Sequence, residues 1–110
     1  MNVIWHEDAK RGRLQVSNYI RKHFGYRRMK VFIQEVGEQV RALKQYPNIG
    51  AIDSLFADRS EEYRSVIIGG LSKMVYLIGT DTIHIVGFWD CRQEPENQAT
   101  HISETNEIEK

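Results

Sequence analysis

The sequence has few cysteines, few prolines and no long apolar run. Its 110 residues include one cysteine, Cys91, and two prolines, Pro47 and Pro95. A single cysteine excludes a disulfide within the chain and a metal site built from cysteines. No apolar stretch approaches the roughly 18 residues that cross a bilayer, and the N-terminal residues lack the pattern of a secretory signal. We therefore expect a cytoplasmic protein with one hydrophobic core and no membrane contact.

Acidic residues are scarce in the first half of the chain, although the net charge of the whole is zero. Between Lys10 and Lys44 there are ten Lys or Arg and two Glu, a net charge of +8. Between Glu94 and Lys110 there are five Glu and one Lys, a net charge of −4. This asymmetry suits a nucleic acid or an acidic protein partner, and it equally suits helices whose outer faces are simply solvated. The neutral total argues against nucleic-acid binding by charge alone.

The first half of the chain predicts a short strand and two helices. Residues 3–5 are apolar, and a helix with one apolar face follows from about residue 7 to Phe24, where Gly25 ends it. That face is formed by Ala9, Gly12, Val16, Tyr19, Ile20 and His23. A second helix has an apolar stripe at Met29, Phe32, Ile33, Val36, Val40 and Leu43. The short link at Gly25 predicts that the two helices pack as an antiparallel hairpin, with the second stripe in the core.

The second half predicts three strands. Residues 63–68, 73–78 and 82–89 are rich in β-branched and aromatic residues, and glycine-containing turns separate them. Alternation in the last strand places Ile83 and Ile85 on one face and His84, Val86 and Phe88 on the other. Before these strands, residues 51–59 form a connector with an apolar patch at Ile52, Leu55 and Phe56, which we expect to be pinned onto the core.

These elements predict an α+β fold of order β-α-α-β-β-β. The helical hairpin is expected to cover one face of a small, mainly antiparallel sheet. We assign residues 1–95 to a single domain and residues 96–110 to a polar, acidic tail that we expect to be mobile.

Metal chemistry and cysteine chemistry find little support. His6, His23, His84 and His101 have no partner at a metal-ligand spacing, and His84, beside apolar residues of a strand, suits a structural role. A nucleophilic Cys91 would need a base, but His84 lies seven residues earlier, about 20 Å away along a straight strand. We expect no metal and no cofactor.

Metal-free RNA cleavage is a further possibility. Arg64, Lys73 and Arg92 could supply cations against the charge of a phosphorane, and Trp89 could stack on a base. The alternative is structural: Arg64 pairs with Glu61 or Glu62, Arg92 pairs with Asp90, and Trp89 closes the edge of the core.

The order of motifs resembles a known family. Its parts are a strand ending in Trp5, a helical hairpin, Leu43 followed by Pro47-Asn48-Ile49-Gly50, then Tyr63-Arg64-Ser65, Lys73-Met74-Val75-Tyr76, Ile83-His84-Ile85 and Trp89-Asp90-Cys91-Arg92-Gln93-Glu94-Pro95. Together these segments resemble the RelE/ParE toxins of type II toxin–antitoxin systems, formerly described as plasmid stabilisation proteins. The family fold has the element order expected above.

The resemblance implies a toxin that is bound and neutralised by a cognate antitoxin encoded by an adjacent gene. RelE-like members are metal-free endonucleases that cut mRNA on the ribosome, and ParE-like members act on DNA gyrase. Residues 93–97 include no Tyr or His at the place where nuclease members carry one, so the sequence is closer to ParE-like members. The resemblance places target contacts at Arg64, Lys73, Trp89, Asp90 and Arg92. If the chain is a nuclease, Arg64, Lys73 and Arg92 are the candidate catalytic residues. A relative without toxicity remains a third alternative.

Overall fold

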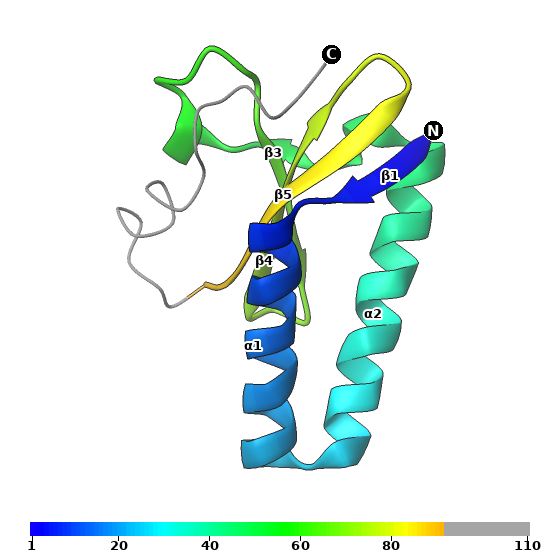
Figure 1. Cartoon of the computed structure of the whole chain (residues 1–110), viewed down its shortest axis with the longest axis vertical. Helices are drawn as coiled ribbons and strands as arrows, with labels where there is room; N and C mark the ends of the chain where they lie inside the picture. Colours follow the sequence, from blue (N-terminus) through cyan, green and yellow to red (C-terminus); the bar gives the residue numbers. More distant parts are fainter. Residues whose placement is uncertain (92–110) are drawn as a thin grey trace.

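The computed structural model describes residues 1–91, which fold into two helices on a five-stranded sheet (Figure 1). The helices are α1 (Glu7–Phe24) and α2 (Tyr26–Gln45). The strands are β1 (Asn2–Trp5), β2 (Ala51–Ile52), β3 (Arg64–Ile68), β4 (Ser72–Ile78) and β5 (Thr82–Asp90). Two 3₁₀ turns, η1 (Pro47–Ile49) and η2 (Ser54–Phe56), flank β2. The predicted α+β fold and the order of its main elements are confirmed, with β2, η1 and η2 as additions.

The sheet has the strand order β1-β5-β4-β3-β2. β3, β4 and β5 pair antiparallel in sequence order, as the short turns between them predict, and β2 pairs antiparallel with β3. β1 instead pairs parallel with β5, with Val3 opposite Ile83 and Trp5 opposite Ile85. The first strand of the described chain therefore pairs with the last strand.

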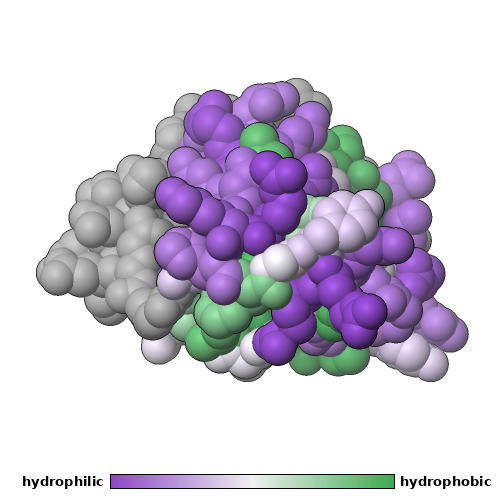
Figure 2. All heavy atoms as spheres, turned by 90° about the horizontal axis from the view of Figure 1, so that it is seen from below, coloured by the Kyte–Doolittle hydropathy of each residue, from purple (hydrophilic) through white to green (hydrophobic). Residues whose placement is uncertain are grey.

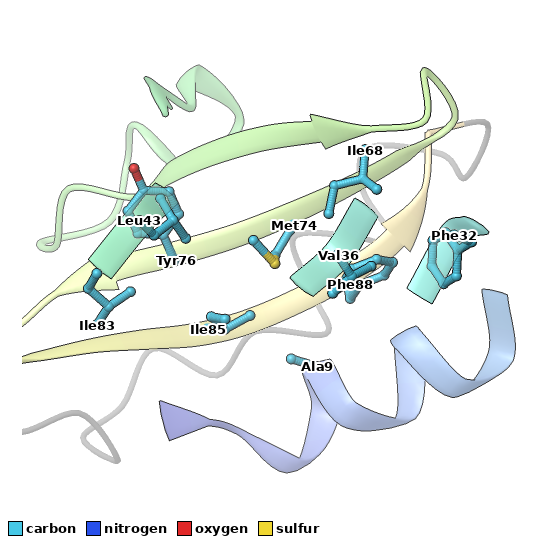
Figure 3. Close-up of a cluster of buried hydrophobic side chains, with 10 residues drawn as sticks. All are labelled: Ala9, Phe32, Val36, Leu43, Ile68, Met74, Tyr76, Ile83, Ile85 and Phe88. Atoms are coloured by element: carbon cyan, nitrogen blue, oxygen red, sulfur yellow. The ribbon is translucent and has the colours of Figure 1, made fainter. Parts of the chain in front are cut away.

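The helical hairpin lies against one face of the sheet and encloses the main core. Gly25, with a φ of 94°, is the junction where α1 ends and α2 begins. α1 approaches β5 closely at Gly12, where an added Cβ would collide with the carbonyl oxygen of Phe88. Figure 3 shows the buried side chains of this core, which come from both helices and from β3, β4 and β5: Ala9, Phe32, Val36, Leu43, Ile68, Met74, Tyr76, Ile83, Ile85 and Phe88.

Several residues of the predicted apolar faces are outside the core. Ile33 of α2 is 51% exposed, and Tyr19 of α1 is 41% exposed. Ile52 of the connector is 59% exposed, whereas Phe56 of the same connector is fully buried. Periodicity predicted the two helical positions as core because it identifies which side of a helix faces the core, but not how much of that side the rest of the protein covers.

The predicted alternation along β5 is wrong at its C-terminal end. Val75 pairs with Gly87 and Tyr76 pairs with Ile85, so Val86 is an extra residue in β5 at a β-bulge. The bulge shifts the side-chain alternation by one residue, so Phe88 joins Ile83 and Ile85 in the core under the helices. Val86 remains on the opposite face.

The face away from the helices carries a second, smaller core. Phe56 of η2 and Tyr63 cover Val75 and Leu77 of β4 and Val86 and Trp89 of β5. The connector is thus pinned to the sheet as predicted, on the side opposite the helical hairpin.

The end of the predicted domain and the acidic tail, residues 92–110, lie outside the described residues. Neither helix of the described chain has the length and apolar character that crossing a membrane requires.

Candidate functional site

Lys73 and Trp89 are brought together on the sheet face away from the helices. They are directly paired on β4 and β5, so their side chains lie on the same face. Both contact Phe56: the ammonium of Lys73 lies 5.8 Å from the centre of its ring, and the Trp89 ring stacks on it at 6.3 Å. Two of the predicted target contacts therefore lie side by side.

Lys73 is engaged by an ion pair. Its Nζ lies 2.9 Å from Oδ2 of Asp53, and the two side chains are 15% and 9% exposed. Oδ1 of Asp53 accepts a hydrogen bond from the backbone N–H of Leu55, which caps η2. Oδ2 is buried, and the ammonium of Lys73 is its partner. The pair holds the connector onto the sheet, and the Lys73 charge is already neutralised by a carboxylate.

Trp89 is 7% exposed, and its position depends on a glycine. Its indole lies over Gly87, two residues earlier on the same strand, where an added Cβ would collide with the ring. The glycine lets the ring lie flat on the sheet beneath Phe56. Trp89 thus closes the edge of the second core, as the structural alternative predicted, and presents little surface on which a base could stack.

Arg64 lies on the other face of the sheet. It pairs with Tyr76 of β4, whose side chain is part of the core beneath the helices. Its Nη1 donates to the carbonyl of Gly50 at 2.8 Å, and its Nη2 contacts Glu62 at 3.4 Å. The predicted pairing with Glu62 is present, and the guanidinium also binds the turn that follows α2. Arg64 and Lys73 therefore do not converge on one site.

Tyr76, which the sequence analysis named in a motif without giving it a role, organises the same turn. Its hydroxyl donates to the carbonyl of Pro47 at 2.6 Å and accepts from the backbone N–H of Gly50 at 2.9 Å. Burial raises the pKa of Tyr76 above its ordinary value, while the Gly50 hydrogen bond and the Arg64 charge lower it in part. A tyrosine on a strand is a common core residue, so no pattern in the sequence indicates that its hydroxyl would bind this turn.

The remaining predicted contacts lie at the C-terminal end of β5. Asp90, the last residue of β5, pairs with Ser72 and is half-buried. Cys91 is exposed. Partial burial of its thiol raises its pKa; the charge of Lys73 lowers the pKa in part, and the charge of Asp90 raises it further. A raised pKa keeps the sulfur as a thiol at neutral pH, which does not suit a nucleophile. Arg92 lies outside the described residues.

The three histidines of the described chain do not form a metal centre. Within residues 1–91, no group of three or more His, Cys, Asp or Glu is arranged to hold a metal ion. His84 is buried, and its Nδ1 lies 3.0 Å from Nε2 of His6, the residue that precedes α1. The two rings link β5 to the start of the hairpin, which fits the structural role expected for His84.

A groove of about 700 Å³ runs between α1 and α2 on the surface of the hairpin. Leu14, 59% exposed, and Ile33, 51% exposed, contribute apolar surface to opposite sides of it. The apolar lining is Trp5, Leu14, Phe32, Ile33, Val36 and Val40. Phe32, Ile33, Val36 and Val40 of this lining were predicted as core; Phe32 and Val36 are buried in it, whereas Ile33 is left uncovered.

The charged lining of this groove is entirely basic. Lys10 and Arg13 come from α1 and Arg41 comes from α2. The guanidinium of Arg13 lies 4.3 Å from the centre of the Trp5 ring, so the cation is stacked on the wall of the groove. An apolar floor with cations along it fits an amphipathic segment that carries acidic residues.

Comparison with known proteins identifies the fold. The sequence matches no protein-family model and no curated protein. Among solved structures, a chain of the "Chromosomal ParDE TA system from P. aeruginosa" is similar, with a TM-score of 0.66 and 18% sequence identity. The match covers 82% of this chain and 95% of that chain. At this identity the similarity shows a shared fold, two helices on a five-stranded, mainly antiparallel sheet.

Proposed function

We propose that this chain is the toxin of a bacterial type II toxin–antitoxin module, inhibits growth by binding DNA gyrase, and is neutralised by an antitoxin encoded by an adjacent gene. The observation that carries the proposal is the fold shared with a chain of a ParDE system over most of both chains. The sequence motifs that resemble RelE/ParE toxins support it independently.

The groove between α1 and α2 is the proposed antitoxin site. A helical or extended segment with apolar residues on one side would bury Leu14 and Ile33, and its acidic residues would meet Lys10, Arg13 and Arg41. Exposed apolar surface next to cations is costly to leave in water, which favours a partner that covers both.

The arrangement of cations weighs against the alternative of an mRNA endonuclease. Such an enzyme needs several cations around one phosphate. Arg64 and Lys73 lie on opposite faces of the sheet, and each is bound to groups of its own chain. A gyrase-binding protein needs no such convergence, so the structure favours the first candidate.

Inducible expression in a bacterium, with and without the adjacent gene, tests the proposal. We expect growth arrest with DNA breaks and an SOS response while translation continues, and relief by the adjacent gene. Early loss of translation with cut mRNA would instead establish the endonuclease. An absence of growth arrest would indicate a relative of these toxins without toxicity and would overturn the proposal.

Two substitutions separate neutralisation from toxicity. Ile33→Glu places a carboxylate in the groove and should weaken antitoxin binding about tenfold or more while toxicity persists. Leu71→Glu is a matched control, because Leu71 is 55% exposed and lies outside the groove lining. Equal neutralisation of both variants would indicate that the antitoxin binds outside this groove.

Two further substitutions test the target surface that the resemblance assigns. Arg92→Ala should weaken toxicity, whereas Cys91→Ala should leave it intact, because the thiol is not expected to act as a nucleophile. Full toxicity of the Arg92 variant, or its loss in the Cys91 variant, would contradict this assignment.

A further inference from the structure

The end of the helical hairpin where α1 meets α2 carries only positive charge. We call residues 19–31 the hairpin tip. No Asp or Glu occurs from residue 9 to residue 34, and the tip alone contains five basic residues, Arg21, Lys22, Arg27, Arg28 and Lys30. All five are exposed. Seen end-on, the molecule shows mainly hydrophilic surface with smaller apolar areas between (Figure 2).

These charges act together. With a rise of 1.5 Å per residue, Arg21 and Lys30 lie within about 8 Å of the junction along their helix axes. Salt screens charges over a comparable distance of about 8 Å at physiological ionic strength. The five cations therefore produce one concentrated positive field rather than separate local ones.

Aromatic rings lie exposed among these cations. Phe24 is 57% exposed and Tyr26 is 63% exposed, on either side of Gly25. The guanidinium of Arg28 lies 5.9 Å from the Phe24 ring, and the ammonium of Lys30 lies 5.6 Å from the Tyr26 ring. Tyr19, 41% exposed, lies with its ring centre 6.4 Å from that of Phe24.

The fold accounts for this surface only in part: Arg21 and Lys22 lie in the last turn of α1, where positive charge suits the helix dipole, but the rings and the cations of α2 have no such role. Phe24 and Tyr26 belong to neither core cluster. The first turn of α2 has no acidic residue and instead contains Arg27 and Arg28, although positive charge at a helix N-terminus opposes the helix dipole. Local departures from favourable sequence choices concentrate where a protein binds something.

We propose that the hairpin tip binds single-stranded nucleic acid. Phosphates contact the five cations, and unpaired bases stack on Phe24 and Tyr26. Grooves or surfaces that combine cations with exposed aromatic rings are the usual design for single strands, because every base has a π face.

Other anionic partners fit the tip less well. An acidic helix would be favoured by aliphatic anchors, and the exposed aliphatic residue of the tip is Val31 alone. An anionic membrane would be favoured by a helix with one continuous apolar face, whereas Phe24 and Tyr26 lie among the cations on either side of Gly25. A DNA duplex would satisfy the cations, but its stacked bases would leave Phe24 and Tyr26 unused. The rings therefore favour an unpaired strand.

Fluorescence anisotropy with the full-length chain and a labelled 12-nucleotide single strand tests the proposal. We expect binding at low salt with a logarithmic salt slope of about −2 to −3.5, from three to five phosphate contacts at about −0.7 each. The same sequence as a duplex should bind more weakly, and polyglutamate or anionic vesicles should compete poorly. Tighter binding of the duplex, the peptide or the vesicles would overturn the proposal.

Three double variants separate charge from stacking. Arg27→Gln/Arg28→Gln should weaken binding and make the salt slope shallower by about 1.4. Phe24→Ala/Tyr26→Ala should weaken binding about fivefold or more with the slope unchanged. The control, Arg11→Gln/Lys44→Gln, removes the same charge toward the other end of the hairpin, outside the groove lining, and should bind nearly as the parent does. Tip variants that match the control would overturn the proposal.

This inference goes beyond the proposed function and does not depend on it. The binding assay uses the purified chain alone, whereas the toxin proposal is tested by growth and DNA damage. A failed binding assay would not change the result of the growth experiment, and an absence of growth arrest would not change the binding result.

Discussion

Arg64 and Tyr76 lie directly opposite each other on β3 and β4, and both bind the turn that ends at Gly50. The guanidinium binds the carbonyl of Gly50, and the phenol binds its N–H and the carbonyl of Pro47. These three hydrogen bonds fix the path of the chain from α2 to the edge of the sheet.

Tyr76→Phe should lower the free energy of unfolding by about 1–3 kcal/mol, because it leaves the buried N–H of Gly50 without its acceptor. Urea denaturation of both proteins measures the change. Phe retains the ring in the core, so a loss can be ascribed to the hydroxyl. An unchanged midpoint would show that the turn does not depend on this bond.

The contribution of the Tyr76 hydroxyl should also disappear at alkaline pH. Burial raises its pKa in the folded state, so the folded protein holds this proton more tightly than the unfolded chain. The stabilisation is complete below the ordinary tyrosine pKa of 10.0 and is lost as the pH rises through the folded value. The stability difference between the parent and Tyr76→Phe should therefore stay constant up to about pH 10 and shrink as the pH rises above it. A constant difference would contradict this linkage.

Gly12→Ala should be destabilising by about 1–3 kcal/mol or more, because the added methyl would meet the backbone of Phe88 and push α1 away from β5. Gly37→Ala is the matched control within α2. Its added Cβ would lie 3.6 Å from Nη1 of Arg41, an ordinary contact, so the higher helix propensity of alanine should stabilise by up to about 1 kcal/mol. Thermal unfolding of both variants measures the contrast, and similar melting temperatures would refute the close approach.

Cys91 should be alkylated slowly at neutral pH despite its exposure. Its raised pKa leaves little thiolate at pH 7, and the rate with iodoacetamide should climb only as the pH rises above the ordinary thiol pKa of 9.0. Lys73→Met removes the cation that lowers this pKa, so it should move the rate profile to higher pH. Rapid alkylation at pH 7 would contradict this prediction.

The sequence predicted the elements better than the faces on which their side chains lie. The helical hairpin, its junction at Gly25 and the three long strands follow from periodicity and glycine placement, which are local signals. The position of Phe88 was missed because a single inserted residue at Val86 reverses the alternation, and nothing in the residue types announces a bulge.

The candidate site was predicted only in part for the same reason. Arg64 and Lys73 were grouped because both lie on neighbouring strands. The register places Ile67 opposite Lys73, and Arg64, three residues before Ile67, points to the other face. Register depends on the geometry of the turn at Gly69 and Gly70, which the residue types constrain but do not determine. The pairing of Lys73 with Trp89 likewise emerges only from the assembled sheet.

The pairing of β1 with β5 has a consequence for how the protein folds during synthesis. The N-terminal strand emerges first, yet its partner is the last strand of the described chain. Both helices are synthesised long before the centre of the sheet on which they pack. Until β5 appears, β1 has no partner strand and α1 lacks the strand on which it packs, so a growing chain remains incompletely assembled. Folding of residues 1–91 is thereby delayed until β5 has been made.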